Sequence, residues 1–553
     1  MGKSISRFQR VPYSVTSFFE DPMSFSCDNL FILEQSFYES QMIEVKSISD
    51  SLIFSISVLI YLICVSCQDG QNSSHEISID QPNIIIIYAD DLGYGDVSAY
   101  GHGTLNTPNF DRIAKEGILF KRGYASSATC TPSRYALLTG QYPWKNKRAR
   151  ILPGNAPLII DTTMQTLPKI MQSVGYKTAV IGKWHLGLGH RELDWNGKIA
   201  PGPNQVGFDY SYILASTNDR APTVYVENDR VVGLESGDLL EVNYKKNFSG
   251  EPTGKENPEK LKVFPSHGHD MSIHNGISRI GFQRGGVTAR YIDEDMSDTI
   301  LSRSLKFIEK HQQVPFFLFY SLHQPHVPRV PHPRFIGQSG MGPRGDVILE
   351  ADWAVGQVLD KIDQLGLAEN TLILFSSDNG PVLNDGYQDQ AVEKIGNHTP
   401  SGGLRGGKYS LYEAGTRVPL MIQWKGTIKP MVSKALVSQI DFSASFAKLL
   451  KVPVNQMDSQ DLLDAFMGKT EKGRDSIVLE AIGRKSYLKR DWILIPPHSG
   501  SPLIATVNIE TGTSDNYQLY RLSDDRAQEN NLAEKFPQRV LQMENELNDL
   551  LKN

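Results

Sequence analysis

Cysteine is almost absent from this 553-residue chain, which contains four in total. Three of them fall within the first 67 residues, and beyond Cys67 only Cys130 remains. A fold stapled by disulfides is therefore excluded for the long remainder of the chain, because a single thiol has no partner there. Most unpaired cysteines behave as small buried apolar residues, so an inert thiol is the ordinary interpretation of Cys130.

An excess of positive charge is absent as well. The chain has 56 lysine and arginine residues against 62 acidic ones, a formal net charge of −6. This balance excludes a nucleic-acid binder that works by neutralising phosphates. The basic cluster at residues 145–148 is local, and it is typical of solvated surface or of the rim of a site for anionic substrates. The length suits one large α/β domain with a smaller companion.

The apolar run at residues 52–65 is too short to span a membrane readily as a helix. The run suits the hydrophobic part of a secretory signal, with Met42 as a candidate true start. Val65, Ser66 and Cys67 resemble the end of a bacterial lipobox, in which Cys67 would carry lipid. An ordinary cleaved signal or an uncleaved anchor fits equally well. We expect export to the periplasm or cell exterior, with membrane contact only through such a signal or lipid.

Strand and helix patterns alternate in most of the chain. Residues 83–88 are a continuous, largely β-branched apolar run, which is typical of a strand buried on both faces. The alternation predicts a large, mixed and mostly parallel sheet sandwiched by helices. Further elements are expected as helices at 107–117, 167–174, 287–311 and 349–365 and as strands at 118–120, 178–181, 315–321 and 371–376.

The predicted organisation has four parts. Residues 1–67 are an N-terminal extension with a signal peptide, and residues 68–81 are a linker. Residues 82–475 form the main α/β domain. Residues 476–553 carry shorter strand patterns and a final helix, which predict a smaller α+β domain with an antiparallel sheet.

The residues that follow Cys130 give its thiol a second interpretation. Pro132 marks the start of an expected helix, whose free N–H groups and dipole favour an anion beside Cys130. Arg134 lies four residues on, on the same helical face, and adds a fixed positive charge. This pattern is typical of a nucleophile that handles an anion. On this short motif alone, a nucleophilic Cys130 and an inert buried thiol are equally good interpretations.

Polar side chains follow four predicted strands at the point where each strand ends. In open α/β sheets, ligands bind outside the carboxyl ends of the strands. Two of these ends carry hard oxygen ligands, and their three carboxylates and one amide favour Ca²⁺ or Mg²⁺ over zinc. Gly93 and Gly95 are expected to let the backbone bend so that adjacent aspartates aim at one point. Each pair alone is also typical of an Asx turn. The two pairs are Asp90 with Asp91 and Asp378 with Asn379.

The other two strand ends carry cationic or proton-transferring groups. Lys183 and His185 are two residues apart and share a face if the segment is extended. His323 and His326 lie in a loop with two prolines, and Lys408 follows a glycine-rich turn. Each of these residues alone is typical of a surface or structural position.

At these residues the chain resembles the formylglycine-dependent type I sulfatases, which are arylsulfatase-like members of the alkaline phosphatase superfamily. Residues 130–140 fit their C-x-P-S-R-x4-T-G modification signature, and residues 175–187 fit their second signature. The resemblance extends over about residues 82–550 in the family's order of motifs. It implies an alkaline phosphatase-like fold and hydrolysis of a sulfate ester.

The resemblance also implies a maturation step and a metal. Cys130 would be oxidised during export to Cα-formylglycine by a separate maturation enzyme. Calcium, with magnesium as the second choice, would be held by the modified Cys130 together with Asp90, Asp91, Asp378 and Asn379.

Catalytic roles follow from the same resemblance. The hydrated aldehyde at position 130 would attack sulfur, with Arg134 stabilising the attacking oxygen. Lys183 and Lys408 would neutralise sulfate oxygens. His326 would protonate the leaving oxygen, and His185 would deprotonate the second hydroxyl of the hydrated aldehyde.

The expected substrate is a sulfated small molecule or glycan, and an exo-acting carbohydrate sulfatase is preferred. The segments 216–220 and 266–270 are polar enough to contact a sugar, but for most of their residues ordinary surface loops are the preferred interpretation. The nearest alternative is a phosphodiester or phosphonate monoester hydrolase of the same superfamily. An exported binding protein with an unmodified Cys130 is the alternative from another class.

Overall fold

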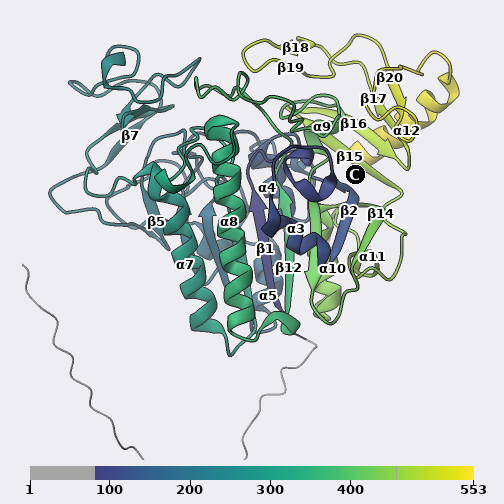
Figure 1. The fold of residues 1–553 in the computed structure, drawn as a ribbon, viewed down its shortest axis with the longest axis horizontal. Helices are drawn as coiled ribbons and strands as arrows, with labels where there is room; N and C mark the ends of the chain where they lie inside the picture. The colour runs from purple at the N-terminus through teal and green to yellow at the C-terminus, as the bar shows by residue number, and fades with distance from the viewer. Residues whose placement is uncertain (1–80, 456, 553) are drawn as a thin grey trace, which may run out of the picture. The chain divides into compact units, whose positions relative to one another are not determined.

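A ten-stranded sheet runs through the centre of the part of the chain that the structure describes (Figure 1). It is seen in a computed structural model that describes residues 81–455 and 457–552. The strand order is β14-β2-β13-β12-β1-β11-β3-β4-β5-β6. The strands are β1 (Asn83–Ala89), β2 (Ile118–Tyr124), β3 (Lys177–Lys183), β4 (Tyr210–Leu214), β5 (Tyr225–Glu227), β6 (Arg230–Val231), β11 (Phe316–Ser321), β12 (Thr371–Ser377), β13 (Leu420–Trp424) and β14 (Met431–Ser438).

The sheet is mixed and mostly parallel, which confirms the prediction. The five neighbouring strands β12, β1, β11, β3 and β4 are parallel, and so is the pair β14 and β2. Strand β13 is antiparallel to both of its neighbours, and β5 and β6 continue the far edge as an antiparallel extension.

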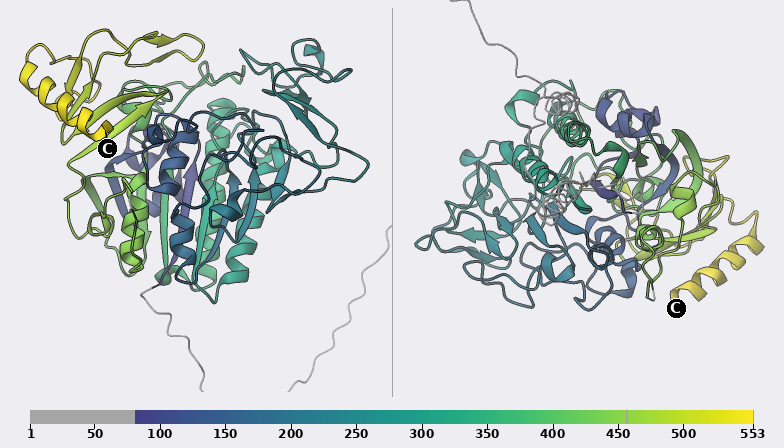
Figure 2. Two further views of the ribbon diagram at one scale, coloured as in Figure 1. Left: turned by 180° about the vertical axis from the view of Figure 1, so that it is seen from behind. Right: turned by 90° about the horizontal axis from the view of Figure 1, so that it is seen from below.

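Helices cover both faces of the sheet, because β1 is apolar at every position from Ile84 to Ile87. Ile85 and Ile87 pack toward one group of helices, and Ile84 and Ile86 toward the other. The two layers are visible from the front in Figure 1 and from behind in Figure 2. The first group is α3 (Pro108–Lys115), α7 (Met296–His311) and α8 (Gly342–Gln364); the second includes α4 (Cys130–Thr139), α5 (Leu167–Gln172), α10 (Phe442–Leu449) and α11 (Leu463–Phe466).

The carboxyl ends of four adjacent strands lie at one edge of the sheet. Tyr88 of β1 is level with Ser321 of β11, and Ser321 is level with Gly182 of β3. Ala89 of β1 is level with Ser377 of β12. The polar residues that follow these strands therefore emerge side by side, as the sequence predicts.

A four-stranded antiparallel sheet forms the C-terminal part, in the order β15-β16-β17-β20. Apolar residues of α12, among them Met543 and Leu547, pack in one cluster with this sheet. Ser127, just before α4, forms a bridge with Glu480 of β15, so this part supports the start of α4. The division into domains 82–475 and 476–553 stays a prediction. The elements are β15 (Ser476–Ala481), β16 (Arg484–Lys489), β17 (Trp492–Ile495), β20 (Gln518–Arg521) and α12 (Pro537–Lys552).

Short elements complete the description. Two of them are one-turn helices, α6 (Pro203–Val206) and α9 (Glu413–Thr416). The others are the paired strands β7 (Glu241–Asn243) with β10 (Phe282–Arg284), β8 (Ile273–His274) with β9 (Ile277–Ser278), and β18 (Leu503–Ile504) with β19 (Ile509–Glu510).

Some element boundaries differ from those that the sequence predicts. Helix α7 begins at Met296 rather than at Val287, because Val287 and Ile292 are exposed and bring no apolar contact to the core. Helix α8 begins earlier than expected, at Gly342. No helix among residues 81–455 and 457–552 combines the length and apolarity needed to cross a bilayer. The expected signal segment and linker, up to residue 80, lie outside the described residues.

Candidate active site

Adjacent aspartates follow β1 and are fully buried. Oδ2 of Asp90 accepts a hydrogen bond of 2.5 Å from the Lys183 ammonium. Asp91 has a left-handed backbone, with φ of 64°, and this residue itself turns the chain so that both carboxylates reach one point. Gly93 and Gly95 act differently from the prediction. A Cβ at either position would collide with the backbone of the 399–402 segment, so these glycines permit a close approach rather than the bend.

Asp378 and Asn379 complete the oxygen-rich side of the site. The backbone N–H of Asp91 donates to Oδ1 of Asp378 at 3.2 Å, and the Asn379 amide donates to Oδ1 of Asp91 at 2.7 Å. Oδ1 of Asp90 and Oδ1 of Asn379 are buried without a hydrogen-bond partner among the described residues. Buried polar atoms normally have partners, and hard oxygens left free in this way are suited to a divalent cation.

Burial and neighbouring charges set the acidity of this group. Burial raises the pKa of Asp90 well above its usual value, and the nearby Lys183 only partly opposes this effect. Asp90, Asp91 and His326 can bring one ligand atom each within 4.8 Å of one another. The predicted metal ligands Asp90, Asp91, Asp378 and Asn379 are thus brought together, and the residues present fit a calcium ion.

Lys183 and Lys408 approach the carboxylates from two sides. Lys183 also lies 3.7 Å from Oδ2 of Asp378. Its neighbour Gly182 has φ of 112°, and a Cβ there would lie 1.8 Å from the Ser321 carbonyl oxygen, so only glycine lets β3 end this close to β11. Lys408 donates to Oδ2 of Asp91 at 2.8 Å. Both ammonium groups are therefore positioned where an anion above the carboxylates would meet them.

Cys130 is the first residue of α4 and is buried. The helix begins two residues before the predicted start at Pro132. Burial raises the pKa of the Cys130 thiol, so at neutral pH the unmodified side chain is a protonated thiol and a poor nucleophile. Arg134 lies one turn on and donates from Nε to Asp378 at 2.9 Å and from Nη1 to Ser321 at 2.6 Å.

His185 faces Cys130. The sequence predicts an extended segment here, but His185 has φ of 55°, which turns its ring toward α4. Its Nδ1 lies 3.3 Å from the Cys130 sulfur, and its Nε2 lies 3.0 Å from the Leu152 carbonyl oxygen. A carbonyl accepts only, so Nε2 carries the proton and Nδ1 is the basic atom toward Cys130. Burial and the Lys183 charge lower the pKa of His185 well below its usual value.

His326 occupies the opposite side of the site. Its Nδ1 donates to the Val327 carbonyl at 2.7 Å, and its Nε2 lies 3.8 Å from Oδ2 of Asp91. Burial and the charge of Lys408 lower the pKa of His326 well below its usual value. His323 is also buried, and Nδ1 of its ring has no hydrogen-bond partner among the described residues. His326 is therefore the histidine of this loop that faces the carboxylates.

The sequence does not predict one buried acid of the site. Asp385 accepts a 2.7 Å hydrogen bond from Lys408, and the Tyr409 hydroxyl lies 3.1 Å from its Oδ1. Burial alone would raise the pKa of Asp385, but the charge of Lys408 lowers it below its usual value. In the sequence Asp385 stands between Asn384 and Gly386, which is typical of a turn, so no signal marked it as functional.

The two polar segments expected as loops also meet beside the site. Oδ2 of Asp219 lies 3.0 Å from Nε2 of His269, and the Arg220 guanidinium pairs with Asp219 at 2.7 Å. Asp219 and His269 are buried. Arg220 is close enough to lower the pKa of His185, and Asp219 close enough to raise that of His326. These residues therefore border His185 and His326 rather than forming ordinary surface loops.

Comparison with known proteins places these features in a family. Residues 82–452 match the family model described as Sulfatase. An N-acetylgalactosamine-6-O-sulfatase from Bacteroides thetaiotaomicron is 47% identical over 494 residues, which cover 88% of this chain and 95% of the relative. Human arylsulfatase A is 32% identical over 409 residues, with 72% and 70% covered. A solved structure from work on the metabolism of multiple glycosaminoglycans by Bacteroides thetaiotaomicron has a TM-score of 0.85 and 46% identity, and covers 86% of this chain and 100% of its own.

Proposed function

The chain belongs to the sulfatase family, and on that basis we propose that it removes sulfate from a sulfated carbohydrate with a formylglycine made from Cys130 and a bound calcium ion. Hydrolysis of sulfate esters and the alkaline phosphatase-like fold follow from the family itself. The observation that carries the finer proposal is that His185 contacts Cys130 at one edge of the sheet, where the charges of Lys183, Lys408, Asp90 and Asp378 also act on its thiol.

The modified Cys130 and calcium supply what the unmodified chain lacks. A hydrated aldehyde would provide an oxygen nucleophile in place of a protonated thiol, and calcium held by Asp90, Asp91, Asp378 and Asn379 would provide positive charge beside it. The free Oδ1 atoms of Asp90 and Asn379 support this assignment.

The chain's own cations bind the sulfate group. Lys183 and Lys408 present buried ammonium groups to the space above the carboxylates, so they can neutralise sulfate oxygens as negative charge spreads over them. Arg134 is held in place by Asp378 and Ser321, and its fixed charge lies on the face of α4 that also carries Cys130.

The two histidines handle protons at different atoms. Nδ1 of His185 is the acceptor beside position 130, because Nε2 is committed to the Leu152 carbonyl. Nε2 of His326 points into the site and is placed to protonate the leaving sugar oxygen. A bound sulfate anion raises the pKa of His326 by favouring the charged imidazole, which offsets the effects of burial and Lys408.

The substrate we propose is N-acetylgalactosamine sulfated at oxygen 6, alone or at the end of a glycan. The support is the relative named for this activity, which is similar over almost its whole length. Asp219, Arg220 and His269 offer a carboxylate, a guanidinium and an imidazole next to His326, where the sugar of the leaving group would lie. Such charged and polar groups are suited to hydroxyl and amide groups of a sugar.

Export and maturation are part of the same proposal. Conversion of a buried cysteine requires an unfolded or partly folded chain, since Cys130 is only 2% exposed in the folded protein. A maturation enzyme that acts during export would meet this requirement. We therefore propose a periplasmic or extracellular location.

The first test measures sulfate release from a panel of defined sugars. Native protein should release sulfate from N-acetylgalactosamine 6-sulfate faster than from the 4-sulfate isomer or from N-acetylglucosamine 6-sulfate. An aryl phosphodiester should be a poorer substrate than the matching aryl sulfate. Faster turnover of the phosphodiester would refute the sulfatase assignment for this site.

The second test examines Cys130 directly. Mass spectrometry of the tryptic peptide that spans Cys130 should show loss of the thiol and the mass of an aldehyde in active protein. The variant Cys130→Ala should keep its circular dichroism spectrum and lose activity. An unmodified thiol in fully active protein would rule out the mechanism while leaving the substrate assignment open.

A further inference from the structure

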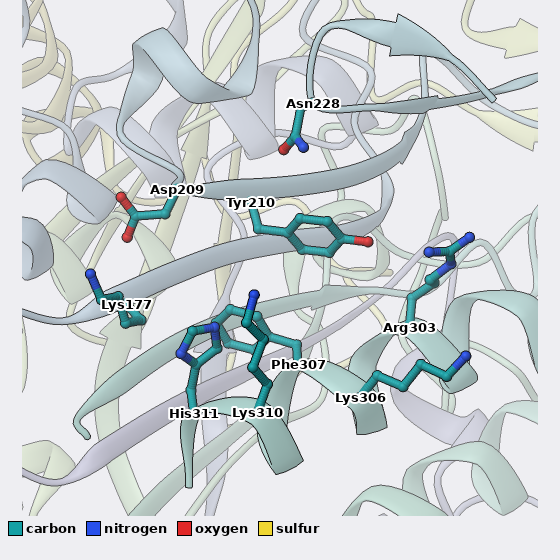
Figure 3. Close-up of a pocket in the computed structure, with 9 residues that line it drawn as sticks. All are labelled: Lys177, Asp209, Tyr210, Asn228, Arg303, Lys306, Phe307, Lys310 and His311. Atoms are coloured by element: carbon teal, nitrogen blue, oxygen red, sulfur yellow. The ribbon is translucent and has the colours of Figure 1, made fainter. Parts of the chain in front are cut away.

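A cavity of about 520 Å³ (Figure 3) is lined by residues at the start of β3, and the active site lies at the other end of that strand. Its walls come from the first residues of β3 and β4 and from the C-terminal half of α7. Lys177, which lines it, is the first residue of β3, whereas Lys183 of the active site is the last. Six steps along a strand correspond to about 20 Å, so the two sites are distinct.

Three lysines give the cavity its positive charge. Lys177, Lys306 and Lys310 line it, are exposed, and form no ion pair with any residue among those described. Burial and the charges of Lys310 and Lys177 lower the pKa of the neighbouring His311, which indicates that their charges converge. The chain as a whole carries a net charge of −6, so this positive region opposes the overall balance.

One carboxylate, Asp209, also lines the cavity, but neither it nor Glu227 of β5 pairs with the lysines. Asp209 accepts hydrogen bonds from the Gln172 amide at 2.7 Å and from the Thr178 backbone at 2.9 Å. Glu227 accepts from the Tyr210 hydroxyl at 2.7 Å and pairs with Arg303 at 3.3 Å. Neither carboxylate lies within ion-pair distance of a lysine that lines the cavity.

Helix stability does not explain the lysine arrangement. Lys310 is in the last turn of α7, where a cation interacts favourably with the helix dipole. Lys306, however, is four residues before Lys310 on the same face, and like charges at this spacing destabilise a helix. Lys177 comes from another element and adds a third charge. An anionic ligand would account for all three.

Aromatic rings form the wall between these charges. The rings of Tyr210 and Phe307 are nearly parallel, at 9°, with centroids 6.4 Å apart. Figure 3 shows the Tyr210 ring reaching across the cavity, with Lys177 on one side and Arg303 on the other. A flat aromatic surface flanked by cations is suited to a ring with an apolar face and an anionic edge, which describes a sulfated or carboxylated sugar.

We propose that this cavity is a second, non-catalytic binding site for a segment of a sulfated oligosaccharide chain. The inference rests on the proposed function, because it assumes that the substrate belongs to a sulfated glycan. A chain held at the lysine cavity raises the effective concentration of its other sulfated units near the active site. Single sulfated sugars gain nothing from it.

Binding stoichiometry tests the proposal. Isothermal titration of the Cys130→Ala variant with a sulfated chondroitin hexasaccharide should show two sites per chain. In a variant that also carries Lys177→Ala, Lys306→Ala and Lys310→Ala, affinity at one site should fall about tenfold or more, as expected for three exposed charge contacts, and the other should remain. An unsulfated hyaluronan hexasaccharide should bind this site more weakly.

A matched control separates the site from general charge. Lys429, Lys434 and Lys448 are exposed lysines on or near β13, β14 and α10, and their replacement by alanine changes the net charge equally. This control should keep both sites. The proposal would be overturned if both triple variants weakened binding equally or if the parent protein showed a single site. It would also be overturned if the Lys177, Lys306 and Lys310 replacements abolished binding to phosphatidylglycerol vesicles but left binding to the glycan unchanged.

Turnover separates this inference from the proposed function. The Lys177, Lys306 and Lys310 triple variant with Cys130 intact should release sulfate from a monosaccharide at the native rate and from a long chain with a higher KM. If no sulfated sugar is hydrolysed by either protein, the proposed function fails, and the titration still decides whether the lysine cavity binds the hexasaccharide.

Discussion

Replacing Asp385 by asparagine tests whether this acid orients Lys408 for the reaction. Lys408 lies between Asp385 at 2.7 Å and Asp91 at 2.8 Å, and all three side chains are largely buried. The Asp385→Asn variant keeps the shape of the side chain and can still accept one hydrogen bond. It removes the negative charge of Asp385, which contacts the Lys408 ammonium group on the side away from Asp91.

The expected size follows from the kind of contact that is lost. A hydrogen bond to a charged group contributes about 1.5–3 kcal/mol, and Lys408 keeps its second partner, so we expect a loss near 2 kcal/mol. This corresponds to a fall of about 30-fold in kcat/KM. Tyr409→Phe removes only the hydroxyl that contacts Asp385 and should cost about 1 kcal/mol, or about fivefold.

The assay is sulfate release from N-acetylgalactosamine 6-sulfate over a range of concentrations, with thermal unfolding measured in parallel. The decrease should fall on kcat more than on KM, because Lys408 meets charge that grows in the transition state. Asp298→Asn is the control, since Asp298 pairs with Arg334 on the surface and its loss should leave kcat/KM unchanged. Activity of Asp385→Asn within about twofold of native protein would refute the orienting role.

Three further predictions concern a proton, the metal and acid stability. His326→Ala should lower turnover of a sugar sulfate by about 10²–10⁴-fold but that of 4-nitrophenyl sulfate far less, because nitrophenolate leaves without a proton; equal losses would contradict the acid role. Chelation should abolish activity with an unchanged circular dichroism spectrum, because Lys183 and Lys408 still partner the carboxylates, and added Ca²⁺ should restore activity better than Mg²⁺. Although burial opposes it, Arg344 and His398 lower the pKa of Asp96 to about 2. The stability that Asp96 contributes is complete above its unfolded pKa near 4 and is lost as pH falls through about 2. Between pH 4 and pH 2, the free energy of unfolding in urea should therefore fall by up to about 2 kcal/mol less for Asp96→Asn than for native protein. Parallel losses in the two proteins would exclude this contribution.

The central sheet could be predicted because its strands carry strong local signals. The apolar run of β1 and the polar residues directly after β1, β3, β11 and β12 define both the strands and the edge where they end. Parallel pairing then brings Asp90, Lys183 and Asp378 together without further information. Asp90 and Asp378 directly follow strands and Lys183 ends one, so the positions of all three depend on few loop torsions.

Residues in long connections could not be placed from the sequence. Asp385, Asp219 and His269 occupy segments without periodic patterns, and their positions depend on contacts between parts of the chain more than 20 residues apart. The sequence predicts the bend at Gly93 and Gly95 instead of at Asp91, because a left-handed conformation is uncommon for a residue other than glycine. Local propensity cannot reveal such a torsion when the tertiary structure imposes it.

The charge balance of the site favours a singly charged ester group. Four buried carboxylates, Asp90, Asp91, Asp378 and Asp385, face three cationic side chains, Arg134, Lys183 and Lys408. In the site without an ester, burial and nearby cations lower the pKa of His185 and His326, so neither imidazole adds a positive charge. A divalent cation at the carboxylates would change this deficit of one positive charge into an excess of one. While His326 is still uncharged, a sulfate monoester, which carries one negative charge, would make the buried site neutral, whereas a phosphate monoester dianion would leave a negative charge uncompensated there. Since an uncompensated buried charge is costly, the same residues that hold the ester also select against the doubly charged analogue.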